Sequence, residues 1–115
     1  MTSLLRNVAA LIAAVTILQL AGGLLGVRIG DANYQHLATY VDEIIQVPDA
    51  PILRAMRFLL DRMKLVAEPS GAITLAALMD GWFTPVGPTV LVLSGGNIEW
   101  PGLMRLLADV APYAD

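Results

Sequence analysis

The chain has 115 residues, of which 57% are hydrophobic and 15% charged, so it is too apolar for a disordered tail and too short for two ordinary domains. Seven Lys and Arg residues against ten Asp and Glu leave a net charge of −3, which excludes the broad cationic surface that nucleic-acid binding requires. The sequence has no cysteine and one histidine, which excludes disulfides, thiolate zinc sites, cysteine nucleophiles and His-rich metal sites.

An uncharged, apolar run occupies residues 7–27, between the arginines Arg6 and Arg28. As a helix it would extend about 30 Å at about 1.5 Å per residue, which matches the hydrocarbon core of a bilayer. We therefore predict a transmembrane or anchor helix through residues 8–27, and treat residues 1–29 as a separate hydrophobic unit. A cleaved signal peptide and a buried helix of a soluble core are the alternatives.

The next part of the chain alternates between helical and strand-like patterns. Residues 33–41 carry apolar side chains at helical spacing and predict a short helix. The β-branched run at 44–47 closes at Pro48 and predicts a short strand. A helix is expected from Asp49, because apolar side chains then recur at steps of three and four as far as Met63.

Breaker residues at 68–71 precede the run AITLAALMDG at 72–81, which predicts a short buried helix that stops at its glycine. The run TVLVL at 89–93 is typical of a strand covered on both faces in a parallel sheet, and a last helix is expected over 101–111. The predicted fold is therefore α/β. Residues 30–115 would form a partial three-layer domain, with a few parallel strands and packing helices, preceded by the long hydrophobic helix.

Two places have a physical rationale for binding a ligand. In VLVLSGGN, the Ser94 hydroxyl and the bare backbone of Gly95 and Gly96 would be accessible at the carboxyl end of a strand. A plain turn is the alternative reading. Glu68 lies beside a helix start, where the partial positive charge stabilises a carboxylate or a bound anion, and a capped helix N-terminus is the alternative. We read His36 as an ordinary, partly buried histidine without a role.

The order KLVAEPSGA, then a small-residue helix, then VLVLSGGN resembles the C-terminal part of the catalytic domain of threonine/serine dehydratases. These enzymes, with the serine racemase-like proteins, use pyridoxal phosphate and have the tryptophan synthase β fold. The likeness runs from about residue 30 to about residue 100. It implies pyridoxal 5'-phosphate as the cofactor and implies as cofactor-binding residues Ser94, Gly95, Gly96, Asn97 and Glu68.

In that family the serine of the SGGN turn binds the pyridine nitrogen of the cofactor, which here implies Ser94. By the same resemblance Gly95 and Gly96 let the ring approach, Asn97 closes the turn, and Glu68 lies near the cofactor pocket. A neutral hydroxyl leaves the pyridine largely unprotonated, which favours elimination of a β-hydroxyl over reactions that need a long-lived carbanion.

The family's Schiff-base lysine lies in an SFKxRGA-like segment, and a glycine loop holds the phosphate; neither motif occurs in this sequence. The sole lysine, Lys64, matches an ordinary position of the family, so no catalytic residue is assigned. We expect a dehydratase-related fragment that is inactive alone and has a complementary dehydratase chain or further copies of itself as partner. The alternatives are a small membrane-anchored interaction protein without catalytic activity and a non-functional remnant.

The apolar start lies outside that resemblance. ILQLAGGLLGVRI weakly resembles the first transmembrane helix of major-facilitator transporters, which suggests a transporter-like beginning joined near residues 28–29 to a dehydratase-like end. The cations downstream favour a cytoplasmic C-terminal part. The expected location is therefore the cytoplasm, either free or anchored to a membrane.

Overall fold

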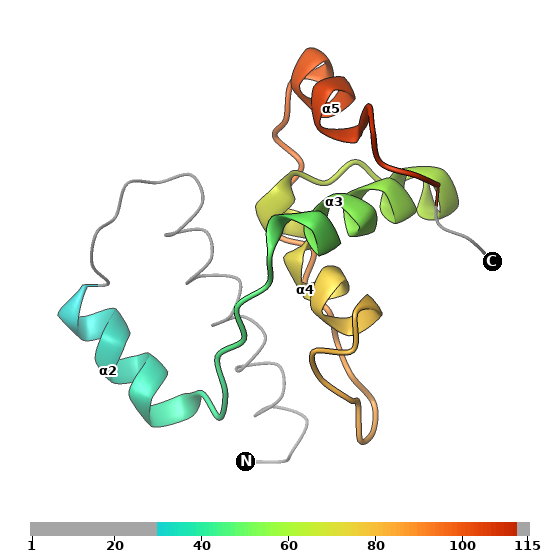
Figure 1. Ribbon diagram of the computed structural model, residues 1–115. Coiled ribbons are helices and arrows are strands. Elements are labelled where there is room, and N and C mark those ends of the chain that lie inside the picture. Colours follow the sequence, from blue (N-terminus) through green and yellow to red (C-terminus); the bar gives the residue numbers. More distant parts are fainter. Residues whose placement is uncertain (1–29, 113–115) are drawn as a thin grey trace.

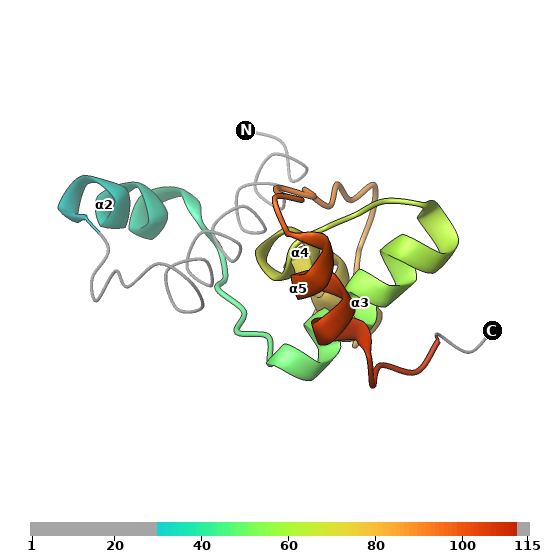
Figure 2. The same ribbon diagram turned by 90° about the horizontal axis from the view of Figure 1, so that it is seen from above.

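The computed structural model describes residues 30–112, and this part of the chain is helical (Figure 1). Helices α3 and α4 pack against each other, and α5 packs against α3. Helix α2 lies apart from the others in both views (Figures 1 and 2), and none of its side chains is buried. The elements, in chain order, are α2 (Asp31–Tyr40), α3 (Asp49–Phe58), the π-helical turn η1 (Leu59–Met63), α4 (Pro69–Met79) and α5 (Trp100–Leu107).

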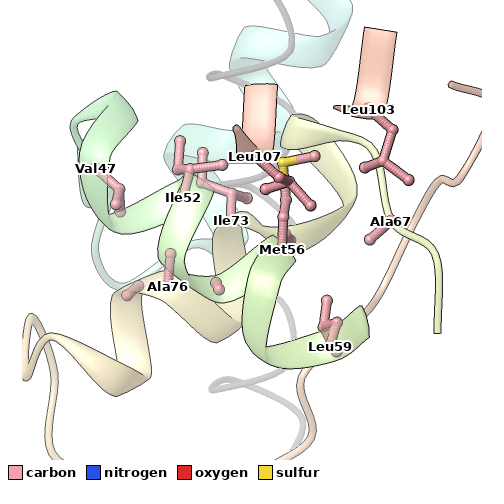
Figure 3. Close-up of a cluster of buried hydrophobic side chains, with 12 residues drawn as sticks. Val47, Ile52, Met56, Leu59, Ala67, Ile73, Ala76, Leu103 and Leu107 are labelled. Atoms are coloured by element: carbon pink, nitrogen blue, oxygen red, sulfur yellow. The ribbon is translucent and has the colours of Figure 1, made fainter. Parts of the chain in front are cut away.

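The core lies where α3, α4 and α5 meet. Apolar side chains of α3 recur at steps of three and four, so one face of the helix is buried, with Met56 at its centre and 1% exposed. Helix α4 buries small residues such as Ala72 and Ala76, which let α3 approach closely. Figure 3 shows the side chains of the three helices converging. The cluster comprises Val47, Ile52, Ala55, Met56, Leu59, Ala67, Ala72, Ile73, Ala76, Ala77, Leu103 and Leu107.

The helix predicted from Asp49 to Met63 is confirmed, but its last turn widens into the π-helical turn η1. The turn ends at Lys64, which adopts the left-handed conformation with φ +57°. The N–H groups of Lys64 and Leu65 both donate to the carbonyl oxygen of Leu59, the latter at 3.0 Å. A left-handed residue reverses the chain and is a common way to end a helix.

The two ends of α4 are joined to different parts of the molecule. Helix α4 ends at Met79, two residues before the predicted stop at Gly81, where φ is +70°. There Asp80 accepts a hydrogen bond from Arg54 of α3 at 2.6 Å, with both side chains partly exposed. Its N-terminal end carries Pro69 in the first turn, where the missing N–H costs no helical bond.

The predicted parallel sheet is wrong for the described residues, because residues 30–112 contain no strand. The β-branched runs at 44–47 and 89–93 are connecting segments. A strand needs a neighbouring backbone to pair with. Within the described part of the chain, no backbone–backbone hydrogen bond involves residues 42–48 or 83–94. Local β-propensity is therefore present without the pairing that makes a sheet.

The predicted long hydrophobic helix over residues 8–27 lies outside the residues that the structure describes. Within residues 30–112 no helix is both long enough and apolar enough to cross a membrane. The short helix predicted at 33–41 is confirmed as α2, which begins at Asp31. His36 of this helix is exposed, so the expectation of partial burial is wrong; its Nδ1 lies 2.9 Å from the carbonyl oxygen of Ala32.

Candidate cofactor site

The structure brings the EPSG and SGGN motifs together at the N-terminal end of α4. The backbone N–H of Glu68 donates to the carbonyl oxygen of Gly95 at 3.0 Å. Six residues further along the chain, the buried hydroxyl of Thr74 in α4 donates to the carbonyl oxygen of Val92, also at 3.0 Å. The segment that ends in the SGGN turn therefore runs antiparallel to α4 and is attached to it at two points (Figure 1).

Glycine is required at the contact between the two motifs. A Cβ on Gly71 would collide with the carbonyl oxygen of Gly95, and a Cβ on Gly95 would collide with Oε1 of Glu68. A Cβ on Gly96 would lie 2.6 Å from the carbonyl oxygen of Val66. The three glycines therefore let the turn lie directly on the chain at 66–71. Sequence reasoning named Gly95 and Gly96 but missed Gly71, although the glycine of EPSG was a visible signal.

Glu68 directly precedes α4, yet its carboxylate does not cap the helix. Its backbone carbonyl accepts hydrogen bonds from the N–H groups of Gly71 and Ala72, at 3.0 and 3.1 Å. The side chain instead accepts a hydrogen bond at Oε1 from the Ser70 hydroxyl at 3.0 Å. This bond holds the half-buried carboxylate beside the α-carbon of Gly95. Ser70 is a second residue that sequence reasoning missed.

Ser94 and Asn97 lie on the exposed part of the same turn. Across Asn97, the N–H of Ile98 donates to the carbonyl oxygen of Gly96 at 2.9 Å, which tightens the backbone. Among the described residues, none forms a hydrogen bond with the Ser94 side chain. The hydroxyl is therefore available as a donor and an acceptor at the edge of a turn whose position is set by α4.

The sole lysine has a structural position of its own. Lys64 is exposed, and its Nζ donates to the carbonyl oxygen of Asp61 at 2.7 Å, at the end of η1. Its left-handed backbone ends that turn. The Lys64 amine is thus held at a helix end by a neighbouring carbonyl group.

A separate open groove lies between residues 43–48 and Trp82. Its lining is more apolar than polar, and it contains none of the five predicted cofactor-binding residues. Trp82, which follows α4, is partly exposed on its wall. The groove is therefore distinct from the EPSG–SGGN contact.

Comparison with known proteins places the chain in a class. The sequence model described as "Pyridoxal-phosphate dependent enzyme" matches residues 8–95. The chain belongs to this family, and the cofactor of the family is pyridoxal phosphate. The predicted relation to pyridoxal-phosphate enzymes is thereby confirmed.

Individual relatives give a narrower picture. The chain is 36% identical over 88 residues to an L-threonine ammonia-lyase of Thermotoga maritima, covering 76% of this chain and 22% of that enzyme. It is 41% identical over 81 residues to an L-threonine ammonia-lyase of Geobacter sulfurreducens, covering 70% and 20%. A serine racemase of Dictyostelium discoideum is 31% identical over 91 residues, covering 76% and 28%. The chain thus spans 20% to 28% of the length of these relatives.

The family match begins at residue 8 and so includes the apolar run. The likeness of that run to a transporter helix is therefore not supported. The predicted relation to threonine and serine dehydratases is confirmed by the relatives, among which are threonine ammonia-lyases. The division of the chain at residues 29 and 30 and the roles of the five site residues stay predictions.

The residues at the EPSG–SGGN contact fit one side of pyridoxal phosphate. The Ser94 hydroxyl is uncharged and has no partner among the described residues, which suits a neutral ring nitrogen. The close glycine packing holds this hydroxyl on a fixed backbone. The only lysine amine, that of Lys64, is bonded at the end of η1. The described residues therefore fit the ring contact.

Proposed function

We propose that this chain supplies the pyridine-nitrogen contact of a pyridoxal-phosphate site in a threonine/serine dehydratase-type lyase, and that it is not a competent enzyme alone. The observation that carries the proposal is the pairing of the two motifs through the Glu68 N–H and the Gly95 carbonyl. This bond and the glycine packing present the Ser94 hydroxyl at one defined place. The proposed substrates are hydroxy amino acids that lose ammonia by β-elimination.

In this proposal Ser94 binds and orients the ring through its hydroxyl. A hydroxyl carries no charge, so it does not stabilise a proton on the ring nitrogen as a carboxylate would. When bound, the cofactor supplies the electron sink for elimination. Gly95 and Gly96 allow the ring to approach the backbone, and Asn97 completes the turn.

Glu68 contributes a carboxylate next to the turn. Its Oε1 accepts the Ser70 hydrogen bond and lies against Gly95, so the position of the carboxylate is restricted from two sides. In the proposal this carboxylate lines the cofactor pocket and accepts a further hydrogen bond there. Neither Glu68 nor Ser94 provides the amine that a Schiff base requires.

A complementary polypeptide of the same family is the proposed source of that amine and of the phosphate-binding loop. Further copies of this chain are the second proposed partner. We place the protein in the cytoplasm in this proposal, since the family match includes residues 8–27, the run that a membrane anchor would need.

Titration of the full chain with pyridoxal phosphate, followed by absorbance and by tryptophan fluorescence, tests the proposal. We expect weak, non-covalent binding that Ser94→Ala abolishes and that the matched change Thr84→Ala, at an exposed hydroxyl outside the turn, leaves unaltered. Lys64→Arg should also leave binding unaltered. The proposal fails if the chain does not bind the cofactor, if Ser94→Ala binds equally well, or if borohydride reduction fixes the cofactor specifically on Lys64.

A further inference from the structure

The sequence contains one Asp–Gly step, Asp80–Gly81, and it lies directly after α4. Both residues are exposed to solvent. Gly81 has a φ of +70°, and nothing lies within 4 Å of the position that a Cβ would occupy. An Asp–Gly step differs chemically from other aspartate steps, because glycine has no side chain to hinder an attack by its own amide nitrogen on the preceding carboxyl carbon.

The reaction open to this step is isomerisation through a cyclic imide. The Gly81 amide nitrogen forms a bond to Cγ of Asp80, and one carboxyl oxygen leaves as water with the amide proton and one proton from solvent. Water then opens the ring. Opening at one carbonyl restores aspartate, whereas opening at the other leaves the main chain running through Cγ, as isoaspartate. The water and the proton exchanged in the first stage are returned in the second, so solvent is the only co-reactant.

The backbone at the end of α4 opposes this reaction. The N–H of Gly81 donates to the carbonyl oxygen of Leu78 at 3.1 Å, and the N–H of Trp82 donates to the carbonyl oxygen of Ala77 at 2.9 Å. These two bonds form a Schellman motif, a common helix ending in which a left-handed glycine closes the last turn. The Gly81 nitrogen is not free to attack while its N–H is bonded to Leu78, so the last turn has to open first.

The Asp80 carboxylate is restrained by a second interaction. Its Oδ2 accepts a hydrogen bond from Nη2 of Arg54 at 2.6 Å, across the contact between α3 and α4. The imide carries no negative charge, so ring closure removes the group that the Arg54 guanidinium binds. The ion pair and the Schellman motif therefore both have to open before the reaction proceeds. Helix ends open locally more readily than helix interiors, which leaves this route accessible without global unfolding.

We propose that Asp80–Gly81 is a site of spontaneous conversion of aspartate to isoaspartate, and that Arg54 limits the rate by holding the carboxylate in the ion pair. This inference is independent of the proposed function. Isoaspartate adds one carbon to the main chain and removes one from the side chain. The geometry of the Schellman motif and of the ion pair is lost together, so the conversion loosens the end of α4 from α3.

Incubation of the full chain at neutral pH, at a temperature well below its unfolding midpoint, tests the inference. Electron-transfer fragmentation of the digested chain in a mass spectrometer distinguishes isoaspartate from aspartate at each position. We expect isoaspartate to accumulate at Asp80 and not at Asp42, which is also exposed but is followed by the side chain of Glu43. Absence of the product at Asp80, or equal accumulation at Asp42, overturns the inference.

Matched variants test the part played by Arg54. Arg54→Ala should speed the conversion about two- to fivefold, the factor that corresponds to the loss of an exposed ion pair. Arg54→Lys keeps the positive charge and should restore most of the protection. Arg57→Ala is the control, because it makes the same change on α3 and removes only the ion pair with Asp61 at 2.5 Å. No acceleration in Arg54→Ala, or equal acceleration in both alanine variants, contradicts protection by Arg54.

Discussion

The backbone N–H of Glu68 donates to the carbonyl oxygen of Gly95 at 3.0 Å, and this bond joins the start of α4 to the turn that carries Ser94. The two residues also touch through the Glu68 side chain, since a Cβ on Gly95 would collide with Oε1. Glu68 and Gly95 therefore both fix the position of the turn. The effects of substitutions at these two residues on stability can be compared.

Replacing Gly95 by alanine should destabilise the protein by about 1 to 3 kcal/mol, because the added methyl group overpacks a close contact. The obstacle is the end of a flexible side chain, so Glu68→Ala in the same protein should recover part of the loss. Urea unfolding of the two single variants and the double variant measures this coupling. Gly87→Ala is the control, because nothing lies within 4 Å of its Cβ position. Additive effects of the two substitutions would contradict the contact.

Gly71→Ala should be the more damaging of the two glycine changes. Its Cβ would meet the backbone carbonyl oxygen of Gly95, and a backbone atom has less freedom to move than a carboxylate. Removing the Glu68 side chain should therefore give no recovery in this variant. Thermal unfolding followed by circular dichroism compares the two double variants directly.

Thr74→Val should cost about 1 kcal/mol of unfolding free energy, since it keeps the shape of the side chain and removes one buried hydrogen-bond donor. Thr74 as a whole is 1% exposed, and its hydroxyl donates a hydrogen bond to the carbonyl oxygen of Val92. Urea unfolding of the variant measures this loss. Thr39→Val on the exposed helix α2, where the hydroxyl bonds within the helix, should change stability by no more than about 0.5 kcal/mol.

Met56→Ala should destabilise the protein by about 2 to 5 kcal/mol, because it opens a cavity where α3, α4 and α5 meet. Met56 is 1% exposed, whereas Met104 of α5 is 52% exposed. The same truncation at Met104 should therefore change stability by about 0.5 kcal/mol at most. Guanidinium unfolding midpoints of the two variants provide the comparison, and similar losses would contradict the position of the core.

Lys64→Gly should raise stability by up to about 1 kcal/mol, because glycine adopts a positive φ without the steric cost that lysine bears. The gain is reduced by loss of the exposed bond from Nζ to the Asp61 carbonyl. Lys64→Ala removes that bond and keeps the Cβ, so the difference between the two variants isolates the backbone effect. Differential scanning calorimetry compares the two variants. If Lys64→Gly were less stable than Lys64→Ala, the left-handed conformation would be contradicted.

The helices were predictable because their signals are local. The apolar spacing from Asp49 to Met63, Pro69 in a first turn and Gly81 at a stop each act within a few residues of the chain. The motif pair around Glu68 and Ser94 was also visible as a resemblance. Its geometry was not visible, because the contacts of Gly71 with Gly95 and of Thr74 with Val92 join residues far apart in the sequence.

The predicted strands at 44–47 and 89–93 are absent because strand formation, unlike helix formation, is not decided by local signals. The β-branched run at 89–93 expresses a real local preference, but pairing depends on a second backbone that no local pattern supplies. Composition and motif order alone determined the enzyme family and the helical segments, since both depend on residue identity and short-range spacing. Only the tertiary structure decided that the SGGN turn lies on α4, that glycine is required there, and that residues 89–93 stay unpaired among the described residues, since these properties arise from atoms brought together by folding.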